Sequence, residues 1–277
     1  MTKVEALNAR LYSVKIRLLD MYHAAHAGHI GCSLSCTEML VHLKFSWMQP
    51  EDRLILSKGH AAALLYSVFA EAGEISEETI GTFYHNGTTL PAHPPVNQVK
   101  PIPFATGSLG HGLSLSAGMA FGARMKGDAR RHFCVTSDGE LDEGSTWEAA
   151  MFIAHHRLTN VIWLIDRNSI QGIGRTEEVL RLEPLKAKLE SFGFHVSEAD
   201  GHDFNALERA KAECADVSAS AGKPCVVICS TVKGHGVSYM EDTVDCHYLP
   251  MTEEQYHQAI DELKAWRAAT SGRRHES

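Results

Sequence analysis

The chain has 277 residues, of which 44% are hydrophobic, enough for one large α/β domain with a substantial core. Its net charge of −8 without a basic stripe argues against a nucleic-acid partner, and no apolar run of about 18 residues predicts a membrane span. The N-terminus lacks the apolar core of a signal peptide, so we expect a cytoplasmic protein whose seven cysteines are reduced, buried side chains.

The first part of the chain predicts two helices, then a strand and a further helix. Apolar residues at steps of four, three and four predict the opening helix: Leu7, Leu11, Val14 and Leu18. This helix ends in a glycine-rich loop around His29, and residues 35–38 (SCTE) predict a capping box for the second helix. Residues 52–56 predict a strand, and a glycine-containing turn leads into a helix over residues 61–72. Such a turn at a helix N-terminus suits an anion.

A long connection and a helix of small residues come next. Residues 81–111 hold five of the nine prolines and show no clear period, which is typical of a functional or disordered segment. Residues 112–122 predict a helix rich in small residues, of which glycine and serine lower the helix propensity. Close packing against a cofactor or another helix would explain this composition, and so would ordinary tight core packing.

The chain is organised around residues 132–171, which predict a strand, a helix and a second strand. The strands cover residues 132–136 and 161–165, and the second is apolar at every position, as in a parallel strand buried on both faces. Between them one helical face is apolar at steps of four, three and four: Trp147, Met151, Ala154 and Leu158. This is a βαβ unit with an expected right-handed crossover.

Polar residues follow both strands of this unit. Asp138 stands next to Gly139 after the first strand, and Asn168 follows the second, 30 residues later (168 − 138). Loops at the carboxyl edge of a parallel sheet bind ligands, and carboxylate and amide oxygens suit Mg²⁺ or Ca²⁺. Gly139 would let the backbone approach a phosphate closely. An acidic turn with an unrelated asparagine turn is the plain alternative.

The last part of the chain continues the alternation of strands and helices. We predict strands over residues 194–197 and 225–229, and helices over 182–192, 204–219 and 252–268, before a charged tail, residues 271–277, that we expect to fray. The whole pattern predicts an α/β fold with a doubly wound, mostly parallel sheet flanked by helices, and a single domain over residues 1–277.

Five segments, in order, resemble the transketolase family over about residues 7–265. They are AGHIGCSLSCTEML, DRLILSKGHAAALLYSVFAEAG, PFATGSLGHGLSLSAGMAFG, SDGELDEG with IDRNSIQGIG, and TVKGHGVSYMEDTVDCHY. The resemblance implies the diphosphate-binding domain of a thiamine diphosphate enzyme. In that family an aspartate, an asparagine and a backbone carbonyl two residues later hold the metal on the cofactor, which implies Asp138, Asn168 and Ile170 here.

The same resemblance implies the remaining site residues. The residues implied to bind the cofactor are His60, Gly107, Ser108, Leu109, Asp138, Gly139, Glu140, Asn168 and His247. The residues implied to face the substrate and exchange protons with its hydroxyls are His29, His93 and His247, because histidine titrates near neutral pH. Glu143 matches a glutamate at the interface of paired active sites, with an exposed glutamate at a helix start as the alternative.

The chain departs from the family pattern in several places. Ser137 stands where the metal motif usually has glycine, and His111 replaces a common glutamine. Ala92 and two prolines flank His93 in place of the family's GHPE, which suggests a changed substrate edge. Cys246-His247-Tyr248 stands where the family has Trp-His-Gly.

The resemblance implies the N-terminal subunit of a split transketolase, which transfers a two-carbon ketol unit from a ketose or ketose phosphate to an aldose. Its cofactors would be thiamine diphosphate and Mg²⁺ or Ca²⁺. The chain has no sequence left for the family's two further domains, so the implied partner is a C-terminal subunit with the aminopyrimidine-binding half, in an α2β2 assembly. Alternatives are a subunit resembling 1-deoxyxylulose-phosphate synthase or 2-oxoacid dehydrogenase, and a non-catalytic cofactor-binding module. A nucleotide-binding protein is not favoured, because GxGxxG and Walker patterns are missing.

Overall fold

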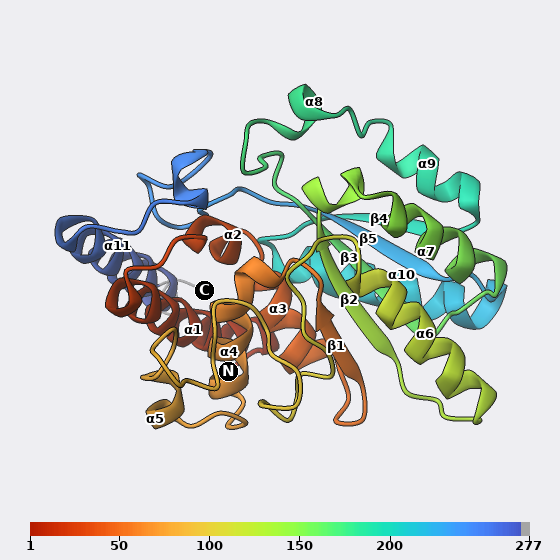
Figure 1. Ribbon diagram of the computed structural model, residues 1–277, viewed down its shortest axis with the longest axis horizontal. Helices are drawn as coiled ribbons and strands as arrows, with labels where there is room; N and C mark the ends of the chain where they lie inside the picture. The colour runs from red at the N-terminus through yellow and green to blue at the C-terminus, as the bar shows by residue number, and fades with distance from the viewer. Residues whose placement is uncertain (273–277) are drawn as a thin grey trace.

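Five parallel strands form the sheet at the centre of the computed structural model, which describes residues 1–272 (Figure 1). Their order across the sheet is β1-β2-β3-β5-β4. The strands are β1 (Arg53–Leu56), β2 (His132–Ser137), β3 (Val161–Arg167), β4 (His195–Asp200) and β5 (Cys225–Ser230). The predicted βαβ unit is confirmed: β2 and β3 are parallel neighbours, with Ser137 opposite Asp166. Every predicted strand is present, with boundaries that match the prediction or differ from it by up to three residues.

Helices cover both faces of the sheet, so the predicted doubly wound arrangement is confirmed (Figure 1). Alternate residues of each strand point to opposite faces: in β3, Ile162 and Leu164 join one core, and Trp163 and Ile165 join the other. The first core is packed by α1 (Lys3–Ala25), α3 (Thr37–His42), α4 (Ala62–Glu71), α10 (Phe204–Ala221) and α11 (Glu253–Gly272). The second is packed by α6 (Gly112–Met125), α7 (Gly144–His155) and α9 (Leu185–Phe192).

Short helical turns lie mainly in the loops around the carboxyl edge of the sheet. They are α2 (Ile30–Leu34), the π-helical turn η1 (Leu43–Trp47), α5 (Glu77–Ile80), α8 (Thr176–Val179) and the 3-10 turns η2 (Gly59–Ala61), η3 (Gly139–Asp142) and η4 (Asp245–His247). No helix within residues 1–272 is long and apolar enough to cross a membrane. All seven cysteines are buried with free thiols, as predicted.

The predicted capping box at residues 35–38 is wrong. Helix α3 begins at Thr37, and its N-cap residue, Cys36, makes no capping bond through its side chain. The Ser35 hydroxyl instead donates to Asp166 in β3, 2.6 Å away. The second half of the predicted glycine-rich loop is also helical, as α2. The expected fraying concerns a tail of which residues 273–277 lie outside the described part of the chain.

A buried ion pair joins α1 to α3. Lys15 Nζ lies 2.8 Å from a carboxylate oxygen of Glu38, and both side chains are about 95% buried. Burial alone would raise the pKa of Glu38, but Lys15, with His202 and His235, outweighs it and lowers the pKa to about 2. Because the folded-state pKa is depressed, the stability that this pair contributes is fully present above the usual carboxyl pKa of 4.5 and is lost as pH falls toward 2.

We expect Lys15→Met to destabilise the protein by roughly 3 kcal/mol at pH 7, because it leaves the Glu38 carboxylate buried without its partner. The difference in stability between variant and wild type should shrink as the pH falls below about 4.5, because the wild type then begins to lose the contribution of the pair. Urea unfolding between pH 3 and 7 measures both effects. Lys186→Met is the matched control, since its pair with Glu198 is half-exposed and worth less than about 1 kcal/mol. Equal losses of unfolding free energy in the two variants would show that the buried pair stabilises the protein no more than the half-exposed pair.

Candidate active site

A cavity of about 270 Å³ opens at the carboxyl edge of the sheet, among the segments that follow β1, β2, β3 and β5. This is the edge at which open parallel sheets bind their ligands. Seven of the predicted site residues line it: His60, Leu109, Asp138, Gly139, Asn168, Ile170 and His247. Segments that are distant in sequence therefore converge on one cavity.

The three predicted metal ligands lie together in this cavity. The buried Asp138 accepts hydrogen bonds through Oδ2 from the Ser169 amide at 2.7 Å and the Thr176 hydroxyl at 3.0 Å. Asn168 donates through Nδ2 to Asp166, which leaves its Oδ1 as the oxygen available to a cation. The Asn168 Oδ1 accepts the amide of Ile170 at 3.1 Å, so the carbonyl of Ile170 is held close by.

This oxygen set suits a divalent cation. Burial, and next the Asp166 carboxylate, raise the pKa of Asp138 above its usual range. Within residues 1–272 no lysine or arginine forms an ion pair with Asp138, so its charge lacks a cationic partner. A carboxylate, an amide oxygen and a carbonyl are hard ligands of the kind that Mg²⁺ and Ca²⁺ prefer. The residues present therefore fit a divalent cation.

Lys233, which the sequence analysis did not single out, sets the tautomer of His247. Its buried ammonium donates to the carbonyls of Ile170 at 2.9 Å and Gln171 at 3.3 Å, and it lies 2.7 Å from His247 Nδ1. Because an ammonium can only donate, Nδ1 accepts and the ring proton sits on Nε2. Burial, and next Lys233, lower the pKa of His247 to about 3. His247 is therefore a neutral hydrogen-bond donor toward the cavity.

Four predicted histidines form one cluster beside the predicted metal ligands. The His29 ring lies 5.7 Å from that of His60, 6.3 Å from that of His93 and 5.2 Å from that of His247, measured between ring centroids. Burial is the main cause that lowers the pKa of His29, His60 and His93. Neutral imidazoles can both donate and accept, which suits hydrogen bonding and proton exchange with hydroxyl groups.

The other predicted cofactor residues lie around the cavity rather than in its lining. Gly107 sits against His93, where an added Cβ would lie 3.6 Å from the ring. Ser108 is exposed. Glu140 is fully buried behind the wall, where it accepts from the Gly110 amide at 2.8 Å, and burial raises its pKa to about 7. Glu140 thus holds the loop before α6 in place. Glu143 is exposed at the start of α7.

A buried charged pair that sequence reasoning missed supports the site from behind. Lys58 contacts the Asp166 carboxylate and donates to the Cys32 carbonyl at 2.8 Å, and both charged side chains are fully buried. Asp166 in turn orients the amide of Asn168. The signals were present in the segments SKGH and IDRN, but the two residues are 108 positions apart. Nothing local indicates that they meet.

A second cluster of possible metal ligands, Glu38, His202 and His235, places donor atoms within 4.8 Å of one another. It already contains a cation, the Lys15 ammonium. His202 Nε2 accepts the Val232 amide at 2.8 Å, so Nδ1 carries the proton and donates to Glu38. Both nitrogens of His202 are therefore occupied, and the cluster acts as a structural network around the buried Glu38.

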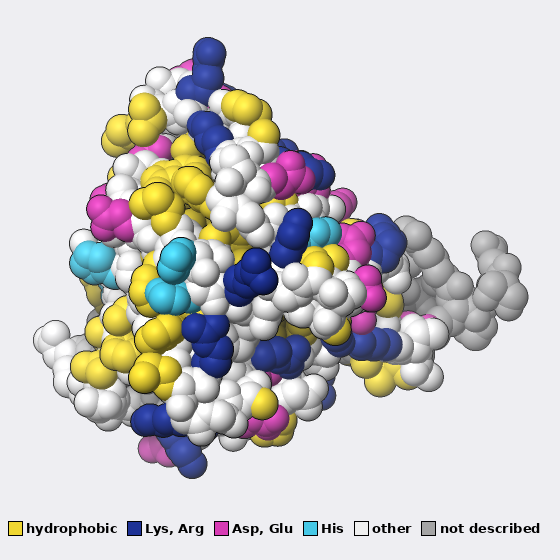
Figure 2. Space-filling model, turned by 90° about the vertical axis from the view of Figure 1, so that its right-hand side faces the viewer, with side chains coloured by type: hydrophobic (Ala, Val, Ile, Leu, Met, Phe, Trp, Pro, Cys, Tyr) yellow, Lys and Arg dark blue, Asp and Glu magenta, His cyan; other side chains and the backbone are white. Residues whose placement is uncertain are grey.

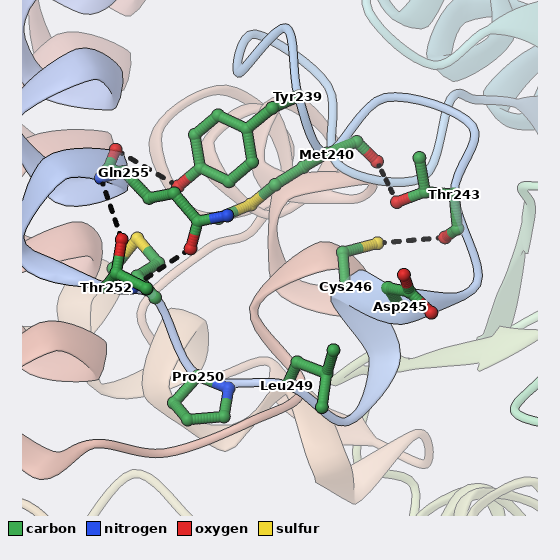
Figure 3. Close-up of a pocket in the computed structure, with 10 residues that line it drawn as sticks. Tyr239, Met240, Thr243, Asp245, Cys246, Leu249, Pro250, Thr252 and Gln255 are labelled. Atoms are coloured by element: carbon green, nitrogen blue, oxygen red, sulfur yellow. Dashed lines mark hydrogen bonds between the residues drawn. The ribbon is translucent and has the colours of Figure 1, made fainter.

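A further cavity, of about 360 Å³, lies on the other side of η4 (Figure 3). Cys246 and Leu249 border it together with Tyr239 and Met240, whereas His247 and Tyr248 border the first cavity. The Cys246 thiol donates to the Thr243 carbonyl at 3.1 Å. The short turn η4 is thus the wall between the two cavities.

The fold and this geometry define a class: a parallel α/β domain with a ligand cavity at its carboxyl edge, lined by carboxylate, amide and carbonyl oxygens and by histidines. Residues 8–269 match the family model described as transketolase, thiamine diphosphate binding domain, and the chain belongs to this family.

Named relatives and a solved structure agree with this family assignment. The chain is 38% identical over 246 residues to an apulose-4-phosphate transketolase subunit from Actinobacillus succinogenes, covering 86% of this chain and 88% of the relative. It is 39% identical over 250 residues to a 6-deoxy-6-sulfo-D-fructose transketolase subunit from a Clostridium species, with the same coverage. A Campylobacter jejuni transketolase structure superposes with a TM-score of 0.87 at 27% identity. The match covers 95% of this chain but 43% of that one, so the chain spans less than half of that enzyme.

Proposed function

We propose that this chain is the cofactor-binding subunit of a two-chain transketolase that transfers a two-carbon ketol unit from a ketose to an aldose. The observation that carries the proposal is the convergence of Asp138, Asn168 and Ile170 with the histidine cluster in one cavity. The two relatives named as transketolase subunits support it, because they have nearly the same length as this chain.

The chain's own residues would divide the work as follows. Asp138, Asn168 and the Ile170 carbonyl would hold Mg²⁺, or Ca²⁺, on the diphosphate. His60 and His247, next to these ligands, would donate to diphosphate oxygens. His29 and His93, which belong to the cluster but do not line the cavity, would orient substrate hydroxyls and exchange protons with them. Thiamine diphosphate, when bound, supplies the carbanion and the electron sink.

The companion chain would dock beside α6. Ser114 and Gly118 are exposed, and an added Cβ at Gly118 or Gly122 meets nothing within 4 Å, so tight packing within this chain does not account for these two glycines. On neighbouring α7, Met151 and Phe152 are 50% and 39% exposed. Figure 2 looks onto the side where α6, α7 and α9 end in Figure 1, and hydrophobic side chains gather there in patches. An α2β2 assembly with shared sites fits such a surface.

The donor sugar we propose is a ketose that carries an anionic group. One relative is named for a sugar phosphate and the other for a sulfonated sugar, so relatives of this length are associated with anionic ketoses. The deciding experiment supplies the chain, its companion subunit, thiamine diphosphate and Mg²⁺ with a ketose phosphate and an aldose. Formation of a ketose two carbons longer than the aldose supports ketol transfer. Decarboxylation of a 2-oxoacid without ketol transfer would instead favour a 2-oxoacid dehydrogenase type of subunit.

We expect His29→Ala and His93→Ala each to reduce turnover by about 10²–10⁴-fold while cofactor affinity stays nearly intact, because neither residue lines the cavity that contains the proposed metal ligands. Steady-state kinetics of the assembled enzyme and calorimetric titration with thiamine diphosphate separate the two effects. His85→Ala, in an exposed loop, is the control. Full turnover in either site variant would show that this histidine does not act on the substrate.

A further inference from the structure

Tyr248 lies at the mouth of the candidate active site, at the position where the family motif has glycine. Its ring centroid is 4.5 Å from that of His247 and 6.0 Å from that of His29. The side chain is 55% exposed, and its hydroxyl makes no hydrogen bond within residues 1–272. An aromatic side chain with a free hydroxyl thus borders the cavity next to two predicted site histidines.

The glycine at position 172 makes room for this hydroxyl. The φ of Gly172 lies outside the left-handed region, so its backbone would accept any residue. An added Cβ, however, would lie 2.1 Å from Tyr248 Oη and 3.3 Å from His247 Nε2. Gly172 follows Ile170 by two residues, so the tyrosine hydroxyl lies beside the metal-binding loop.

The backbone around Tyr248 is fixed against the opposite side of the cavity. The His29 amide donates to the His247 carbonyl at 2.8 Å. An added Cβ at Gly28 would lie 2.3 Å from the Tyr248 carbonyl oxygen. The backbone of Tyr248 therefore packs against the loop that precedes α2, and its hydroxyl lies against the loop that follows β3. The side chain thus spans the mouth of the cavity.

We propose that Tyr248 is a further cofactor-binding residue, whose ring covers the diphosphate end of the cavity and whose hydroxyl donates a hydrogen bond to a diphosphate oxygen. The inference rests on the proposed function. A phenol facing an anion is a good donor, and charge-assisted hydrogen bonds are short and strong. Glycine at this position could make neither contact. Tyr248 would thus add a contact that the family's glycine cannot make to those expected from His60 and His247.

The test titrates the full chain, with Mg²⁺, against thiamine diphosphate and separately against inorganic pyrophosphate. Tyr248→Phe removes only the hydroxyl, and we expect it to weaken binding of both by about 10-fold or more, as for loss of a hydrogen bond to a charged group. Gly172→Ala should act similarly by displacing the phenol, and it should have no further effect on binding in a Tyr248→Gly background. Tyr84→Phe, 53% exposed and outside the site, is the control.

Unchanged binding of both ligands by Tyr248→Phe would overturn the inference, and so would a loss seen with thiamine diphosphate but not with pyrophosphate. Circular dichroism and urea unfolding establish that each variant folds; Tyr248→Phe decides the matter if Gly172→Ala does not fold. If the wild-type chain binds thiamine diphosphate and the Tyr248→Phe variant binds it with the same affinity, only the role of Tyr248 is contradicted. A wild-type chain that binds neither ligand, alone or with its companion, would overturn the proposed function and this inference together.

Discussion

Asp138→Ala is expected to abolish Mg²⁺-dependent binding of thiamine diphosphate. The variant removes the one carboxylate among the three proposed metal ligands, so the site would offer the metal no negatively charged ligand. Even partners outside the direct ligand set are typically worth about 10–100-fold in metal affinity, so we expect a loss beyond about 100-fold. Titration calorimetry on the assembled enzyme, at several Mg²⁺ concentrations, measures the effect.

Two controls separate metal binding from folding in this experiment. Asp142→Ala removes a nearby carboxylate, which accepts from Gln171 Nε2 at 2.8 Å and does not line the cavity, and it should bind the cofactor normally. Thr176→Val removes a 3.0 Å hydrogen bond to Asp138 but leaves the carboxylate in place, so its loss should be much smaller. Wild-type affinity in a folded Asp138→Ala variant would remove this residue from the metal site.

The parts of the fold that depend on local pattern are predictable from the sequence. Strand β3 is an example: parallel strands are covered on both faces, so residues 161–166 are all buried and the apolar run is nearly continuous. Asp138 and Asn168 are predictable as neighbours for a similar reason, because both follow strands that end at one edge. The resemblance then indicates which chemistry such neighbours perform.

The contacts that orient the site depend on residues far apart in the chain, and the sequence does not reveal them. Ser35 illustrates this: a capping box predicts that its hydroxyl bonds within its own helix, whereas the hydroxyl donates to Asp166, 131 residues away. A buried carboxylate beside Lys58 is the stronger acceptor, because an ionised group makes the stronger hydrogen bond. Lys233 escapes prediction similarly, since its role depends on the carbonyl of Ile170 and on His247.

The small-residue helix shows how the structure decides between two explanations that a sequence leaves open. Tight core packing explains Gly112, because an added Cβ there would lie 2.2 Å from the Ser57 hydroxyl oxygen. It does not explain Gly118 and Gly122, which face open space. Small residues without side-chain neighbours in their own chain are expected where another chain approaches closely.

The isolated chain is expected to show no ketol-transfer activity, and a companion subunit should restore activity and strengthen cofactor binding together. The chain spans 43% of the length of the Campylobacter jejuni transketolase, and the proposed cofactor cavity is open at the carboxyl edge of the sheet. Obligate interfaces commonly bury about 2,000 Å² or more and are rich in apolar groups. The exposed Met151 and Phe152, next to the open side of α6, provide part of such a surface.

Gly118→Arg tests where the companion docks. The site is open, so the variant should fold, yet a long charged side chain on this face should prevent assembly and so abolish turnover. Ala212→Arg places the same side chain on an exposed position of α10, across the sheet from α6, and should leave assembly intact. Size-exclusion chromatography with light scattering reports the assembly, and a ketol-transfer assay reports the activity. Robust turnover by the isolated chain would refute the two-chain enzyme, whereas normal assembly of Gly118→Arg would move the docking surface away from α6.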